Sequence, residues 1–188
     1  IVVNREKDFQ DNITLADGYI DKGKFDLAKT KYLRANAIKP TDYYSRNQAK
    51  KIDEYLKHID DGDYSKSRNK FADALSSYKS ARDVFWNNTV TDKISRVRKE
   101  LDYETAINSG DAYFKSGNYE DAKVRYRDAS RLKPTVRYPK DKIAECEQKI
   151  IDQNYQTTIN SGDAYFRLGN YEDAINEYKE ASRLKPNE

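Results

Sequence analysis

Three segments of this chain occur twice with the same sequence, and one of them is Ala-Ser-Arg-Leu-Lys-Pro at residues 129–134 and 181–186. Asn-Ser-Gly-Asp-Ala-Tyr-Phe occupies residues 108–114 and again 160–166. Gly-Asn-Tyr-Glu-Asp-Ala occupies residues 117–122 and again 169–174, so all three pairs are separated by 52 residues. Repetition at a fixed distance indicates an array of similar units, each of which buries its apolar face against its neighbours.

A looser pattern extends the repetition to four copies. In each copy an aromatic residue is followed by alanine three residues later, by a second aromatic four residues further, and by a second alanine three residues beyond that. The positions that fit are Phe25, Ala28, Tyr32 and Ala35; Phe71, Ala74, Tyr78 and Ala81; Tyr119, Ala122, Tyr126 and Ala129; and Tyr171, Ala174, Tyr178 and Ala181. Spacings of three and four place these side chains on one face of a helix, which predicts that they form the core. The predicted repeats cover about residues 9–54, 55–102, 103–154 and 155–188.

Residues that end helices flank each patterned stretch. Before it stands a residue type that accepts the left-handed backbone conformation, namely Gly23, Asn69, Gly117 or Gly169. Helices commonly end at such residues, so each predicts a tight turn between two helices. Three copies have a proline five residues after the last alanine, where the second helix must stop, and these are Pro40, Pro134 and Pro186. The second copy has Trp86 at that position.

The composition excludes several kinds of protein. Hydrophobic residues make up 37% of the chain and charged residues 36%, which is too polar for a membrane-spanning protein. The single Cys146 cannot form an internal disulfide, and together with the single His58 it leaves no cluster for a structural zinc. The chain begins with Ile and contains no Met, so we expect it to be part of a longer protein.

These positions together resemble the tetratricopeptide repeat. In copies three and four a glycine is followed three residues later by Tyr113 or Tyr165, then by a turn glycine, and then by the Ala, Tyr, Ala and Pro of the second helix. Copy two departs from the family pattern at Ser65 and Trp86. The resemblance implies an all-α fold, an α-solenoid of antiparallel helix pairs with a concave surface lined by the first helices. It covers nearly the whole chain, so we expect a single array over residues 1–188.

The copies exceed the 34 residues of that family because each has an insert before the next first helix. In the third copy the insert includes Lys140–Asp152, where Ile143, Cys146 and Ile150 follow helical spacing. Pro139 suits the first turn of such a helix. Because apolar spacing continues into the next first helix, we expect one rod of about 29 residues, roughly 43 Å long.

The Tyr-Pro-Lys sequence of this insert is similar to long-period repeats of Bacteroidota envelope proteins. This similarity implies a scaffold within an envelope or secretion assembly, located in the periplasm or cell envelope. The residues themselves leave the compartment open, and a cytoplasmic location remains compatible with one unpaired cysteine.

No arrangement of residues indicates an enzyme. His58 stands between Lys57 and Asp60 without a helical neighbour for a proton relay, so we predict a surface side chain. Cys146 falls on an apolar helix face and is predicted to be an inert core thiol. No glycine-rich loop for binding phosphate is present. We therefore predict no catalytic activity, no cofactor and no bound metal.

The family resemblance implies which side chains face the concave groove. One residue after the small residue of each first helix stands an aspartate, and by similarity this position and those three and four residues earlier face the groove. The predicted partner-binding residues are Asp17, Asp21, Asp60, Asp63, Asn108, Asp111, Phe114, Lys115, Asn160, Asp163, Phe166 and Arg167. Chaperone-binding members hold a terminal carboxylate with Lys, Asn and Arg at such positions. Here Ile107 and Ile159 replace the lysine, which argues against that mode of binding.

The aspartate row has two interpretations, which the sequence leaves open. Asp111 precedes Lys115, and Asp163 precedes Arg167, by the four residues typical of intrahelical ion pairs, so the row can be a merely solvated face. The first two copies lack such a base, which predicts an acidic N-terminal half that selects a basic partner.

Phe114 and Phe166 also have two interpretations. They are either apolar anchors in the groove or core side chains between successive repeats, and we favour the core.

The sequence favours a protein-interaction module that binds a peptide or a partner helix in its groove. Two alternatives come from other classes. One is a helical repeat that binds single-stranded nucleic acid, which a pI of about 8.7 permits but which interleaved basic residues and an acidic groove disfavour. The other is a glycan or cell-wall binding module that uses exposed tyrosines and Trp86.

Overall fold

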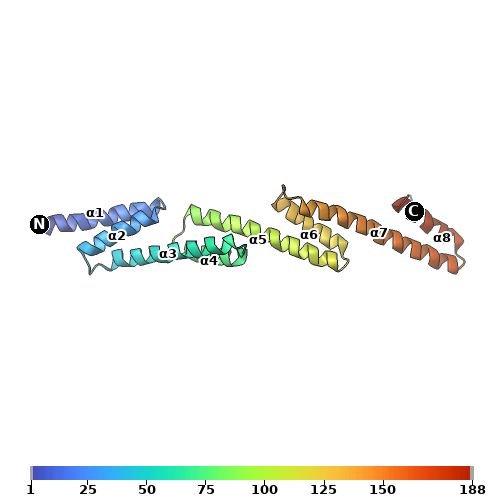
Figure 1. The fold of residues 1–188 in the computed structure, drawn as a ribbon, viewed down its shortest axis with the longest axis horizontal. Coiled ribbons are helices and arrows are strands. Elements are labelled where there is room, and N and C mark those ends of the chain that lie inside the picture. The colour runs from blue at the N-terminus through green and yellow to red at the C-terminus, as the bar shows by residue number, and fades with distance from the viewer. Residues whose placement is uncertain (1, 187–188) are drawn as a thin grey trace. The chain divides into compact units, whose positions relative to one another are not determined.

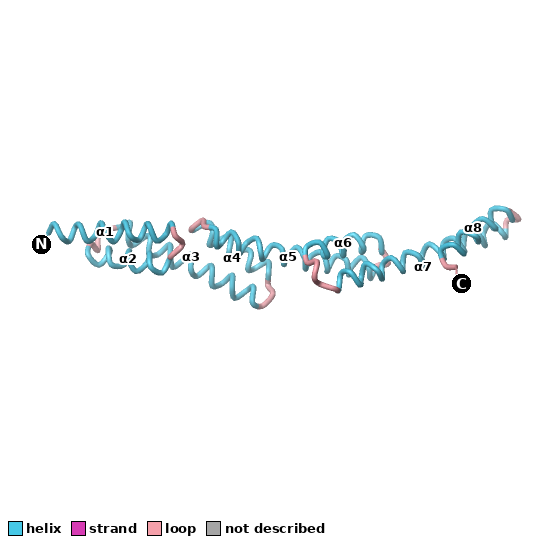
Figure 2. The backbone as a smooth tube through the Cα atoms, turned by 90° about the horizontal axis from the view of Figure 1, so that it is seen from above, coloured by secondary structure: helices cyan, strands magenta, loops and turns pink. Residues whose placement is uncertain are grey.

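The computed structural model describes residues 2–186. Over that range the chain forms eight α-helices and no strand, which confirms the predicted all-α fold (Figures 1 and 2). Residue 1 and residues 187–188, which belong to the predicted array, lie outside it. Its contacts divide the chain into two units, Ile1–Leu101 and Asp102–Glu188, and each is described by itself. The helices are α1 (Val2–Asp21), α2 (Phe25–Ile38), α3 (Tyr43–Ser67), α4 (Phe71–Val84), α5 (Asn88–Lys115), α6 (Tyr119–Leu132), α7 (Tyr138–Arg167) and α8 (Tyr171–Leu184).

The second helix of every repeat, α2, α4, α6 or α8, has 14 residues and begins at the predicted aromatic. The turn before each of them has a residue with positive φ: 66° at Gly23, 58° at Asn69, 80° at Gly117 and 79° at Gly169. This conformation lets the next amide close the preceding helix, as where the Lys24 N–H donates to the Tyr19 carbonyl at 2.8 Å. The predicted helix-to-helix turns are confirmed.

The inserted residues form the first half of a long helix that continues into the next repeat. Helices α3, α5 and α7 have 25, 28 and 30 residues, so the predicted continuous rod is confirmed. Each of the three helices begins with a recognisable signal. Asp42 accepts a hydrogen bond from the Ser45 N–H at 2.7 Å, Asn87 accepts one from Val90 at 2.9 Å, and Pro139 stands in the first turn of α7.

Alanines and tyrosines fill the space between helices. Ala28, Ala74 and Ala122 are fully buried, and Ala174 is 1% exposed. The tyrosines of the first three repeats are also buried, at 1% exposure or less: Tyr32, Tyr78 and Tyr126. The predicted core is therefore confirmed at these positions. It is wrong at Tyr171, which is 60% exposed and whose ring meets that of Phe166 with centroids 5.5 Å apart.

Glycine allows the tyrosine ring to lie directly on the first helix. A Cβ atom added to Gly110 would come within 2.7 Å of the Tyr126 ring, and one added to Gly162 within 2.7 Å of the Tyr178 ring. Real Cβ atoms do not approach so closely, so the ring or the helix would have to move. Gly18, one turn before the end of α1, meets no atom within 4 Å.

These two environments predict opposite effects of the same substitution. Gly110→Ala should lower the free energy of unfolding by about 1 to 2 kcal/mol, because overpacking outweighs the gain in helix propensity. Gly18→Ala should raise it by roughly 0.5 to 1 kcal/mol, since only the propensity changes. Urea unfolding of both variants measures the two effects. A Gly110→Ala variant as stable as Gly18→Ala would contradict the close packing.

Candidate interaction surface

Each first-helix aspartate accepts a hydrogen bond from the tyrosine 15 residues later, in the second helix of its own repeat. Asp17 accepts from Tyr32, and the other donor–acceptor pairs are Tyr78–Asp63 at 2.5 Å, Tyr126–Asp111 at 2.7 Å and Tyr178–Asp163 at 2.7 Å. A phenol whose ring is buried needs a partner for its hydroxyl, and a carboxylate is a strong acceptor. The aspartate row therefore holds the two helices of each repeat together. Neither interpretation of the sequence included this role.

In three repeats the same aspartate receives a second donor from the inserted half of the following long helix. The Tyr44 hydroxyl donates to Asp17 at 2.9 Å and the Tyr138 hydroxyl to Asp111 at 2.8 Å. In the second repeat the donor is the Lys93 ammonium, 2.6 Å and 2.8 Å from the two oxygens of Asp63. Asp17, Asp63 and Asp111 thus each join three helices.

The tyrosines of these clusters remain protonated donors. Burial raises the pKa of Tyr126, and its hydrogen bond to Asp111 raises it further. Burial likewise raises the pKa of Tyr138, followed by its bond to the same carboxylate. The second ring also meets the first edge-on, with centroids 6.3 Å apart.

Lys93 changes the predicted charge of the second repeat. Our sequence analysis considered bases only four residues away on the same helix, whereas Lys93 lies 30 residues after Asp63 and reaches it from another helix. Burial by itself raises the pKa of Asp63, but the hydrogen bonds from Lys93 and Tyr78 outweigh burial, so the pKa lies below its ordinary value. The expectation that no base compensates Asp63 is therefore corrected.

In the first repeat the predicted acidic surface forms a hollow. The hollow has a volume of about 190 Å³ and contains two of the predicted residues, Asp17 and Asp21. The remaining lining is aromatic or uncharged: Ile20, Tyr32, Tyr44, Gln48 and Phe85. We call this the acidic hollow. Two carboxylates among aromatic walls suit a Lys or Arg side chain, whose stem packs on the rings while its head meets the carboxylates.

The family comparison supports the repeat pattern. A family model described as "Tetratricopeptide repeat" matches residues 103–136, and one described as "TPR repeat" matches residues 162–188. The chain therefore contains tetratricopeptide repeats in these two segments. No curated protein sequence matches it. The narrower similarity to long-period envelope repeats stays a prediction.

The two matched segments lie within the predicted third and fourth repeats, 103–154 and 155–188. Tetratricopeptide repeats generally mediate protein–protein interaction and scaffolding, and proteins built from them are generally not enzymes. None of the described helices has the length and apolarity needed to cross a lipid bilayer.

The other predicted groove residues of the four repeats are either phenylalanines that contact another ring or exposed polar side chains. Phe114 is half-buried: its ring meets Tyr119 with centroids 5.1 Å apart, and the Lys142 ammonium lies 4.5 Å from its centre. The core interpretation holds for Phe114. Its counterpart Phe166 is 57% exposed and contacts Tyr171. The remaining polar residues are exposed: Asp21, Asp60, Asn108, Lys115, Asn160 and Arg167.

Residues with catalytic potential are not brought together. The His58 Nε2 lies 3.9 Å from a Glu54 oxygen one turn earlier, a neighbour that our sequence analysis overlooked. Cys146 is fully buried in the core, and burial raises the pKa of its thiol, so the predicted core position is confirmed. Within the described part of the chain no group of three or more His, Cys, Asp or Glu side chains is placed to hold a metal ion.

The lowered pKa of Asp63 predicts a pH-dependent contribution to stability. A carboxyl with a lower pKa in the folded state stabilises the fold above its unfolded value, near 3.9, and loses this effect as pH falls through the folded pKa. Asp63→Asn should therefore destabilise unit 1 at pH 7 and do so less at pH 2.5. Urea unfolding at both values tests this, with the exposed Asp60→Asn as a control that changes stability little at pH 7. An equal loss for Asp63→Asn at both pH values would contradict the role of its charge.

Proposed function

We propose that this tetratricopeptide-repeat protein is a scaffold that binds an extended segment of another protein chain, and that unit 1 selects basic side chains in that segment. The single observation that carries the proposal is the acidic hollow. Its two carboxylates, Asp17 and Asp21, have no basic residue among the side chains that line the same hollow. A lysine or arginine of the partner supplies the missing charge.

The acidic hollow also has a rigid frame, which favours binding. The Asp17 carboxylate is held by Tyr32 and Tyr44, whose rings pack edge-on with centroids 6.0 Å apart. Groups fixed before binding lose little conformational entropy when a ligand arrives. Asp21 is exposed at the end of α1 and can steer a basic segment toward the hollow.

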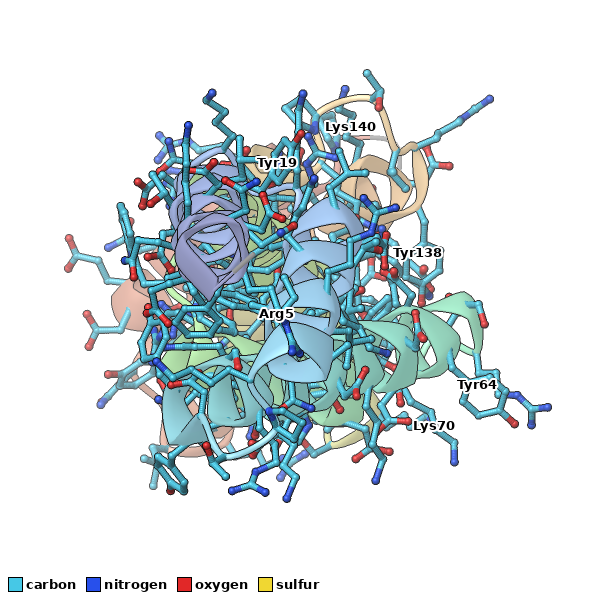
Figure 3. The ribbon with its side chains drawn as sticks, turned by 90° about the vertical axis from the view of Figure 1, so that its left-hand side faces the viewer. Arg5, Tyr19, Tyr64, Lys70, Tyr138 and Lys140 are labelled. Carbon is cyan, nitrogen blue, oxygen red and sulfur yellow. The ribbon has the colours of Figure 1, made fainter. Side chains whose placement is uncertain are left out.

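The two alternative functions predict different ligands. Single-stranded nucleic acid would require a basic surface, and the acidic hollow repels phosphate. A glycan site would use exposed aromatic rings, and Tyr64 is one such residue. Figure 3 shows its side chain extending away from the helix, where the Arg68 guanidinium lies 4.6 Å from the ring centre. Glycans generally stack on a ring face, and here a cation covers one face of it.

A charge reversal in the acidic hollow tests the proposal. Asp21→Lys should weaken binding of lysine-containing peptides from a peptide array by about tenfold, mainly through the association rate, because exposed charges steer encounter. Binding to the unaltered protein should also weaken as salt rises. Surface plasmon resonance gives both rates.

Asp11→Lys is the matched control, since Asp11 is an exposed aspartate of the same helix that does not line the hollow. It should leave binding unchanged. Equal losses in the two variants, or tighter binding of an oligonucleotide than of any peptide, would count against the proposed function.

A further inference from the structure

Unit 1 contains a second hollow of nearly the same size, about 200 Å³, in the next repeat. Its lining contains three basic side chains and one acidic one. The lining residues are Lys66, Tyr78, Thr89, Asp92, Lys93 and Arg96. We call this the basic hollow.

The two hollows occupy equivalent places in successive repeats. Buried residues spaced by four and then three fix the register of the two long helices, and they are Ser45, Ala49 and Ile52 in α3 and Val90, Ile94 and Val97 in α5. In this register Thr89 corresponds to Tyr44, and Lys93 to Gln48. Tyr78 corresponds to Tyr32 of the acidic hollow by the repeat pattern.

Two differences at equivalent positions explain the change at the aspartate: Thr89 stands in place of Tyr44, and Lys93 in place of Gln48. Thr89 is too short to donate to Asp63 as Tyr44 donates to Asp17. Lys93 makes that bond instead, with its ammonium 5.4 Å from the centre of the Tyr78 ring. The Lys93 ammonium thus compensates the charge of Asp63, whereas no basic side chain of the acidic hollow compensates Asp17. The exposed Lys66 and Arg96 then outnumber Asp92, so the basic hollow attracts a carboxylate.

A short segment with an exposed tryptophan connects the two hollows. Phe85 lines the acidic hollow and Thr89 lines the basic hollow. Four residues of chain span at most about 14 Å between Cα atoms, so the hollows lie within reach of one short peptide. Between them in the sequence stands Trp86, which is 71% exposed. Exposed tryptophan is a frequent anchor for the apolar side chain of a partner.

We propose that unit 1 recognises a bipolar peptide segment. A Lys or Arg side chain enters the acidic hollow, an Asp or Glu side chain enters the basic hollow, and an apolar residue between them packs on Trp86. This inference rests on the proposed function and adds the acidic half of the ligand, which replaces our expectation of a purely basic partner for this half of the chain.

Three ten-residue peptides with blocked termini test the inference. The bipolar peptide has two lysines at one end, Leu-Phe in the middle and two glutamates at the other end. In one variant both glutamates are replaced by glutamine, and in the other both lysines are. The unaltered protein should bind the bipolar peptide at least tenfold more tightly than either variant. Trp86 is the only tryptophan, so its fluorescence reports binding directly, and calorimetry gives an independent dissociation constant.

Charge reversal in each hollow assigns each end of the peptide. In Arg96→Glu the preference for glutamate should vanish while the preference for lysine stays. In Asp21→Lys the preference for lysine should vanish while the preference for glutamate stays. Combining a protein variant with a peptide variant in this way separates the energy of one contact from effects of each change on the whole protein. Arg98→Glu, an exposed arginine of α5 that does not line the basic hollow, is the matched control and should leave both preferences unchanged.

The outcomes separate this inference from the proposed function. If replacing the glutamates changes nothing while replacing the lysines weakens binding, the bipolar site is overturned and the basic-peptide function stands. If calorimetry shows binding without a change in Trp86 fluorescence, the apolar contact is overturned. If no peptide binds, or if single-stranded DNA binds and Arg96→Glu abolishes that binding, both proposals fail.

Discussion

In every repeat a tyrosine hydroxyl of the second helix donates to an aspartate of the first helix. The geometry of the repeat depends on this bond. The tyrosine ring lies on a glycine in repeats two to four, which brings the helices close enough for the hydroxyl to reach the carboxylate of the next residue. The ring supplies apolar area, and the carboxylate satisfies the one polar atom that the ring carries into the interface. A long inserted helix then adds a second donor, so the same carboxylate also positions the following repeat element.

Variation around this constant bond gives the repeats different surfaces. Where Tyr44 supplies the second donor, the hollow beside it is lined by two carboxylates and no basic side chain. Where Thr89 stands instead, Lys93 takes over the bond and the hollow becomes basic. The surface charge therefore differs between repeats through lining residues such as Thr89 and Lys93, which replace Tyr44 and Gln48, while the buried tyrosine and its aspartate stay in place. This separation of frame and surface is what a repeat array needs to recognise different partners with one fold.

Most of the fold could be predicted from spacing alone, because helix faces, turns and the continuous rod depend on residues close together in sequence. The structure confirms three such predictions: the buried helix face at Ala122, the turn at Gly117 and the helix start at Pro139. The candidate site could be predicted only in part. Asp17 and Asp21 were found as an acidic surface, but the bonds from Tyr32 and Lys93 join residues 15 and 30 positions apart, and helical spacing does not reveal such pairs. A signal was nevertheless present, since an aspartate recurs beside the small residue and a tyrosine recurs 15 residues later in all four repeats.

The central claim is that the tyrosine–aspartate bond couples the two helices of a repeat, and a double-mutant cycle tests it most directly. Tyr126→Phe removes the donor and keeps the buried ring, Asp111→Ala removes the acceptor, and urea unfolding of the two single variants and the double variant gives the coupling free energy. A bond to a charged acceptor should give a coupling of about 1 to 3 kcal/mol, with the double variant little less stable than the worse single variant. Effects that add to within about 0.5 kcal/mol would show that the two residues act independently, and would contradict the account.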